Sequence, residues 1–122
     1  MMELIDIGID KAIAIRIEGK ITEAEMEEVF SEMKGKIRAY GDIVIFEQID
    51  SFEGVELAGI VDKFKYLFEM GISNITRVAI VTDKQWLSKI VSLEDKLFKN
   101  VHMKCFPFEE REQAIDFLRS GE

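Results

Sequence analysis

The apolar residues of this chain change their spacing several times, and the order of these changes limits the fold more than any single motif. Two β-branched runs open the chain, over Met2–Ile9 and Lys11–Glu18. In the second run Ile13, Ile15 and Ile17 alternate, as the residues on one face of a strand do. The short break between the two runs predicts an antiparallel hairpin.

A helix is predicted directly after this hairpin. Thr22 and Glu25 have the spacing of a capping box, in which each side chain bonds the backbone N–H of the other residue. Gly41 is suited to end the helix, because glycine readily adopts the conformation that follows a last turn. The apolar residues between them form one stripe at helical spacing, namely Met26, Val29, Phe30, Met33 and Ile37.

Strand-then-helix units make up the rest of the chain. The third helical segment is either continuous or broken at Ser92, and the break is favoured because Glu94 would otherwise lie within an apolar arc. We expect strands over residues 42–49, 77–83 and 101–106, followed in turn by helices over about 55–70, 84–99 and 109–119. The order ββαβαβαβα predicts a single α/β domain over residues 1–122, with a mostly parallel five-stranded sheet, an antiparallel N-terminal hairpin and four helices.

Charge and composition exclude several classes of function. The net charge of −8 argues against general nucleic-acid binding, because phosphate neutralisation needs clustered Lys and Arg. Residues 77–105 are the exception, with six basic residues against three acidic ones. The single Cys permits no internal disulfide, the first residues do not have the pattern of a signal peptide, and no apolar run is long enough for a membrane span. We therefore expect a cytoplasmic protein.

Few residues offer catalytic chemistry. His102 and Cys105 are three apart in a predicted strand, so they face opposite sides of the sheet and cannot form a dyad or a metal pair. We interpret Cys105 as a core residue and His102 as a surface residue. Asp50 and Asp83 end two predicted parallel strands, where open sheets place ligand sites, but we interpret both as turn or capping residues. We predict no enzyme activity, no metal and no cofactor.

The third helical segment combines apolar and basic residues. Trp86 opens it, with several lysines nearby, and this mixture is typical of surfaces that contact a membrane or an anionic ligand. The alternative is a tryptophan at the edge of the core beside solvated lysines. The predicted apolar contacts are Val55, Tyr66, Trp86, Leu93 and Leu97. The predicted contacts to anionic groups are Lys84, Lys89 and Lys96.

Short motifs along the chain carry a family resemblance. They are the run Ala79–Asp83 followed by Trp86, then Leu97–Phe98, Phe106–Pro107 and the terminal run Glu112–Leu118. With the order of elements, they make the chain resemble the SpoIIAA-like family, a STAS or SEC14-like domain related in fold to anti-sigma-factor antagonists. The terminal motif usually has Trp where this chain has Phe117.

The resemblance implies two different modes of action. Anti-sigma-factor antagonists place a phosphorylatable serine at the start of the second helix, which corresponds here to Val55 or Glu56, and neither residue can be phosphorylated. Ser51 lies several residues upstream of this position. It is interpreted either as a phosphorylation switch or as a loop serine without such a role. The SpoIIAA-like branch itself is associated with small apolar ligands and membrane surfaces, through mobile second and third helices.

Two functional hypotheses follow. The leading one is a non-enzymatic binding domain that takes an apolar or amphipathic ligand, a lipid or a membrane surface between the second and third helices, which would make the protein peripheral to the membrane. The alternative is a protein-binding regulator of the partner-switching type without the usual phosphoserine, acting through the second helix and a loop that contains Ser51, Glu53 and Glu56. A homodimer, formed through an edge strand or an apolar helix face, is compatible with both hypotheses.

Overall fold

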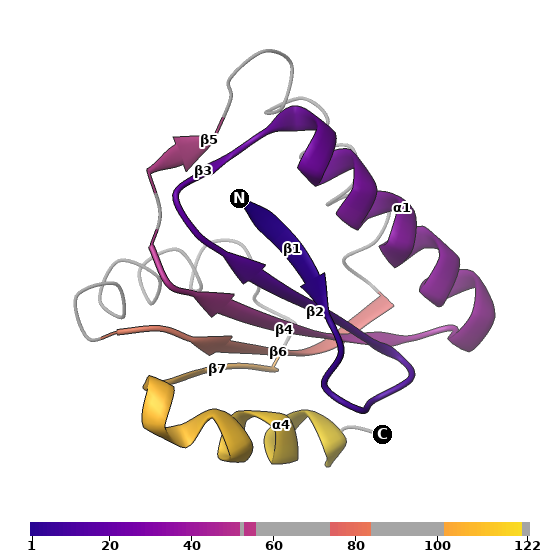
Figure 1. The fold of residues 1–122 in the computed structure, drawn as a ribbon. Helices are drawn as coiled ribbons and strands as arrows, with labels where there is room; N and C mark the ends of the chain where they lie inside the picture. The colour runs from indigo at the N-terminus through magenta and orange to yellow at the C-terminus, as the bar shows by residue number, and fades with distance from the viewer. Residues whose placement is uncertain (52, 56–73, 84–101, 121–122) are drawn as a thin grey trace.

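The computed structural model describes residues 1–51, 53–55, 74–83 and 102–120. Its main feature is a five-stranded sheet in the order β1-β2-β4-β6-β7 (Figure 1). β1 runs antiparallel to β2, and every other neighbouring pair in this sheet is parallel. The bounds of these strands are β1 Met2–Ile5, β2 Ala12–Ile17, β4 Ile43–Ile49, β6 Ile75–Val81 and β7 His102–Phe106. The predicted hairpin and mostly parallel sheet are therefore confirmed.

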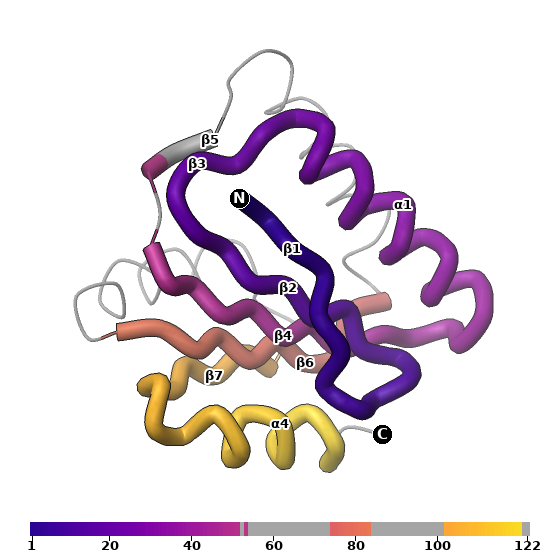
Figure 2. Tube along the Cα trace, viewed as in Figure 1, coloured from indigo at the N-terminus to yellow at the C-terminus, as the bar shows by residue number. Residues whose placement is uncertain are grey.

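Helices lie on both faces of the sheet. Helix α1 spans Glu23–Tyr40, and α4 spans Arg111–Arg119 after a 3-10 turn at Phe108–Glu110. The tube in Figure 2 shows α1 and α4 on opposite sides of the strands. We call the two sides of the sheet the α1 face and the α4 face.

The prediction of four helices is only partly met, since the described part of the chain contains two α-helices. The helix predicted over 84–99, its break at Ser92, and most of the helix predicted over 55–70 lie outside the described residues. One expectation is wrong. Val55 does not begin a helix, because it belongs to strand β5 (Gly54–Val55), which pairs in parallel with an unexpected strand, β3 (Lys20–Ile21).

The termini of α1 follow the predicted signals. The Glu25 N–H donates to Thr22 Oγ1 at 3.2 Å, and the Thr22 N–H donates to Glu25 Oε1 at 2.9 Å, which completes the capping box. At the other end, Gly41 has φ +85°, and its N–H donates to the Ile37 carbonyl at 2.8 Å. The left-handed conformation explains why glycine stands at this position.

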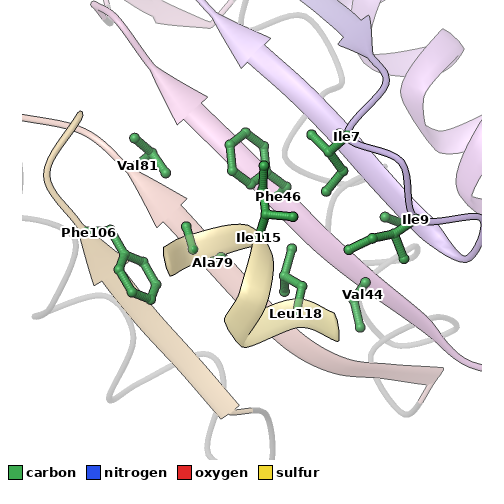
Figure 3. Close-up of a cluster of buried hydrophobic side chains, with 12 residues drawn as sticks. Ile7, Ile9, Val44, Phe46, Ala79, Val81, Phe106, Ile115 and Leu118 are labelled. Carbon is green, nitrogen blue, oxygen red and sulfur yellow. The ribbon is translucent and has the colours of Figure 1, made fainter. Parts of the chain in front are cut away.

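Each face of the sheet carries its own apolar cluster. On the α4 face, Phe46 and Leu118 are fully buried, and Figure 3 shows Ile115 and Leu118 of α4 directed at the strands. On the α1 face, the isoleucines of β2 and β4 pack with Met26 and Val29 of α1. Burial of a large aliphatic or aromatic side chain contributes about 1.5–3 kcal/mol, so these clusters hold the helices to the sheet.

Candidate functional site

The carboxyl ends of the parallel strands meet at one edge of the sheet. In open α/β sheets this edge commonly holds the binding site. Glu18–Gly19 follow β2 at this edge, and Thr82–Asp83 follow β6. After β4 come a loop that begins at Asp50 and then strand β5, which ends at Val55. In Figure 1 the paired strands β3 and β5 stand beyond this edge. We call the described residues of this segment, 50–51 and 53–55, the edge loop.

Backbone hydrogen bonds hold the edge loop against the segment that follows β2. The Asp50 N–H donates to the Ile17 carbonyl at 2.9 Å, and the Glu53 N–H donates to the Gly19 carbonyl at 2.9 Å. The Gly19 N–H in turn donates to Ser51 Oγ at 2.9 Å. The parallel pairing of β3 with β5 extends this contact. The loop is thus held along its length against the segment that follows β2, as a preformed contact surface requires.

Gly19 makes this arrangement possible. Its φ is +70°, a conformation that other L-residues rarely adopt. A Cβ on Gly19 would lie 3.8 Å from Glu53 Oε2, which is an ordinary contact, so the requirement for glycine is conformational rather than steric. The turn at Gly19 brings residues 20–21 beside residues 54–55.

Neighbours on the α4 face stabilise the charge of Asp50. Arg16 Nε donates to Asp50 Oδ2, and Gln48 Nε2 donates to Asp50 Oδ1 at 3.0 Å. Burial works to raise the pKa of Asp50, but the hydrogen bonds from Gln48 and Arg16 and the charge of Arg16 outweigh it, so this pKa lies below its usual value. Asp50 is therefore an ionised anchor for the start of the edge loop.

Thr82 and Asp83 follow β6 at the same edge. Thr82 is fully buried, its Oγ1 donates to the Ile49 carbonyl at 3.2 Å, and its N–H donates to the Phe106 carbonyl at 3.0 Å. These bonds tie the ends of β4, β6 and β7 together. Within the described ranges, no group of three or more His, Cys, Asp or Glu side chains is placed to hold a metal ion.

Glu47 is a candidate functional residue that the sequence analysis missed. It lies on the α1 face of β4, partly buried, with Ile15 opposite it on β2 and Ile80 opposite it on β6. Burial raises the pKa of Glu47 to about 7. The signal in the sequence was alternation, because Ile43, Ile45 and Glu47 occupy one face of a strand. Because the other residues on that face are isoleucines, the Glu47 side chain is expected to lie in an apolar layer.

The predicted site residues fall into two groups. Ser51, Glu53 and the backbone of Val55 come together in the edge loop, where Ser51 is partly buried and Glu53 is exposed. The remaining predicted contacts lie outside the described residues, namely Glu56, Tyr66, Lys84, Trp86, Lys89, Leu93, Lys96 and Leu97.

The predicted separation of His102 and Cys105 is confirmed. His102 is exposed, whereas Cys105 is partly buried and packs against the cluster on the α1 face. The two side chains therefore cannot act together on one group. Neither helix in the described part of the chain is long and apolar enough to cross a membrane.

The family match and the similar solved structures all point to SpoIIAA-like proteins. Residues 12–119 match the SpoIIAA-like family. An uncharacterised protein from Shewanella loihica PV-4 with a SpoIIAA-like fold is 22% identical with a TM-score of 0.70, over 97% of this chain and 92% of that chain. The anti-sigma factor antagonist SpoIIAA in its unphosphorylated form is 15% identical with a TM-score of 0.59, over 98% of both chains. The Bacillus cell fate determinant SpoIIAA in the phosphorylated form is 17% identical with a TM-score of 0.57, over 98% of this chain and 100% of that one.

No curated protein matches the sequence. The solved structures are distant in sequence, so they show that the fold is shared. The family match runs from the first residue of β2 to the last residue of α4 and includes every parallel strand of the main sheet. The chain belongs to the SpoIIAA-like family.

Proposed function

We propose that the protein is a non-enzymatic regulator that binds a protein partner through the edge loop. The observation that carries this proposal is the fixed position of the loop, which is bonded at Asp50, Ser51 and Glu53 while the Glu53 side chain stays exposed. A loop that is already ordered loses little conformational entropy on binding. It can therefore present a charged group to a partner at low cost.

The fold supports a partner of a particular class. One of the similar structures is an anti-sigma factor antagonist, and its resemblance covers nearly all of both chains. We propose by analogy that the partner here is an anti-sigma factor or a related regulatory protein. The exposed carboxylate of Glu53 would meet a basic group of that partner, which favours fast and specific association.

Binding would proceed without the phosphoserine of the antagonists. The position that corresponds to their serine falls at Val55 or Glu56, and the nearest serine, Ser51, accepts a hydrogen bond from the Gly19 N–H. Ser51 has a local structural role in this arrangement. We propose that the amount of protein, rather than its modification, sets how much partner is bound.

The hypothesis of an apolar ligand or a membrane surface has less support. It depends on side chains of the second and third predicted helices, and these lie outside the described residues. The edge loop, by contrast, is described and lies where the fold places binding sites. We therefore rank protein binding first.

The test is a binding titration against purified anti-sigma factors from the source organism, in which biolayer interferometry measures the bound fraction. We expect Glu53→Lys to weaken binding by about tenfold or more, because it reverses a charge at the proposed contact. Asp42→Lys is the matched control, since Asp42 is also exposed but precedes the amino end of β4, at the opposite edge of the sheet. Equal effects of the two variants, or no binding to any anti-sigma factor, would contradict the proposal.

A further inference from the structure

The side of helix α1 that points away from the sheet is exposed. Met26 and Val29 are buried against the sheet, whereas most residues on the other side of the helix are exposed. Exposed residues that recur at intervals of three and four lie in one line along the helix. They are Glu28, Ser31, Gly35 and Arg38, and we call these four residues the outer line of α1.

Charges of like sign are neighbours on this side of α1. Glu28 and Glu32 are four residues apart, as are Lys34 and Arg38, and like charges at this spacing destabilise a helix. Lys36, four residues after Glu32, donates instead to a β2 carbonyl at 2.8 Å. In the described ranges, neither Glu28 nor Arg38 forms a hydrogen bond or an ion pair through its side chain. The two charges of the outer line are therefore available to another molecule.

Gly35 lies in the middle of the outer line, where nothing inside the molecule requires a glycine. Glycine within a helix destabilises it relative to alanine. Gly35 is not among the glycines with a positive φ, and a Cβ there would meet no atom of the surrounding structure within 4 Å. Ser31, about one turn earlier, is also small. These two small residues allow the backbone of a second helix to approach α1 closely.

We propose that α1 of one copy packs antiparallel against α1 of a second copy to form a two-fold symmetric dimer. Charge identifies the occupant, because an antiparallel pair places the acidic first half of each helix beside the basic second half of the other. A register that places Ser31 opposite Gly35 of the other copy also places Glu28 opposite Arg38. The two-fold symmetry makes each of these contacts twice.

A parallel pair is less favourable. It would place Glu28 beside Glu28 of the other copy and Arg38 beside Arg38, so like charges would meet. The antiparallel pair closes on itself, since both copies use the same surface, and association should stop at the dimer. We expect a weak dimer, because a single pair of helices makes an interface of the smallest class, below about 1,200 Å². Salt should weaken it by screening the charges.

The experiment is sedimentation velocity of the full chain over a range of protein concentrations, with charge-reversal variants. Wild type should show a reversible equilibrium between monomer and dimer. Glu28→Arg and Arg38→Glu should each lower the association constant by about tenfold, because like charges then meet across the pair. An equimolar mixture of these two variants should regain association as a heterodimer, since opposite charges then meet again. Glu112→Arg and Arg119→Glu make the same reversals on exposed residues of α4 and should behave like wild type.

A further variant tests the close approach at the centre of the contact. Gly35→Leu should lower the association constant by about tenfold or more, because a bulky side chain keeps the two helices apart. Leucine is a better helix former than glycine, so this variant stays folded, and circular dichroism checks that it does. Loss of association in Gly35→Leu therefore reports on the contact rather than on folding.

The proposal is overturned if wild type stays monomeric at every concentration or assembles beyond a dimer. It is equally overturned if the mixture associates no more than its components, or if Gly35→Leu associates like wild type. Weakening by the α4 variants that equals the weakening by the α1 variants would also overturn it. None of these measurements involves the edge loop or an anti-sigma factor, so they leave the proposed function untouched.

Discussion

Replacing Glu47 by glutamine should stabilise the protein at neutral and alkaline pH. The carboxyl of Glu47 lies among isoleucines, and burial raises its pKa from 4.5 to about 7. Glutamine has nearly the same shape but no charge to desolvate. The folded protein would then no longer hold an ionised group in an apolar layer.

The size of the effect follows from the two pKa values. One pKa unit corresponds to about 1.4 kcal/mol, so the full shift corresponds to about 3 kcal/mol. Glu47 is only partly buried, and water screens part of this cost. We therefore expect Glu47→Gln to raise the free energy of unfolding by about 1–3 kcal/mol above pH 7.

The sign of the pH dependence is fixed. Below about pH 4.5 the carboxyl is protonated in both the folded and the unfolded chain, so it adds no pH-dependent term. Between about pH 4.5 and 7 the unfolded chain releases the proton first, and the stability of wild type falls as the pH rises. Above about pH 7 the carboxyl is ionised in both the folded and the unfolded chain, so the loss of stability of wild type no longer changes with pH.

Urea unfolding followed by circular dichroism measures this difference. The pH range should begin above the isoelectric point of about 4.8, where solubility is lowest. Between about pH 5.5 and 8.5 the advantage of Glu47→Gln over wild type should grow by about 1–2 kcal/mol. Glu32→Gln makes the same change on an exposed helix residue and is the control. An advantage that does not vary with pH, or a less stable Glu47→Gln at pH 8.5, would refute the reasoning.

Three further predictions concern the fold. Thr22→Ala should lower the free energy of unfolding by about 1 kcal/mol, measured by urea unfolding, because it removes the side-chain half of the capping box that bonds the Glu25 N–H. Leu118→Ala should cost about 2–5 kcal/mol and lower the melting temperature, because this side chain of α4 is fully buried against the sheet. Asp50→Asn should destabilise the protein at neutral pH by removing the charge that Arg16 bonds. Because the pKa of Asp50 is lowered, its contribution is present above the usual value of 3.8 and disappears as the pH falls through the folded value, so the two urea midpoints should converge in acid.

Much of the fold could be predicted from the sequence because its signals are local. The capping box at Thr22, the glycine at the end of α1 and the isoleucine alternation in β2 act within a few residues, and all three appear in the structure. The order of strands then follows from right-handed crossovers between parallel neighbours.

The loop around Ser51 and Glu53 was expected, but its strand β5 could not be predicted, because that strand depends on contacts between distant residues. Val55 follows Gly54 and precedes an apolar run, which favours the start of a helix in the local sequence. Its strand conformation comes from pairing with residues 20–21, and that pairing depends on the turn at Gly19. Strand pairs of only two residues carry no periodicity of their own.

Two acids near the end of β4 show how far the surroundings decide the chemistry of a site. Glu47 and Asp50 are three residues apart in the sequence, yet the pKa of one is raised and that of the other is lowered. Asp50 accepts hydrogen bonds from Arg16 and Gln48, so its charge anchors the edge loop. Glu47 lies among isoleucines on the opposite face and reduces stability when it is ionised. Stability alone favours a neutral residue at position 47, so a carboxyl there is not explained by folding.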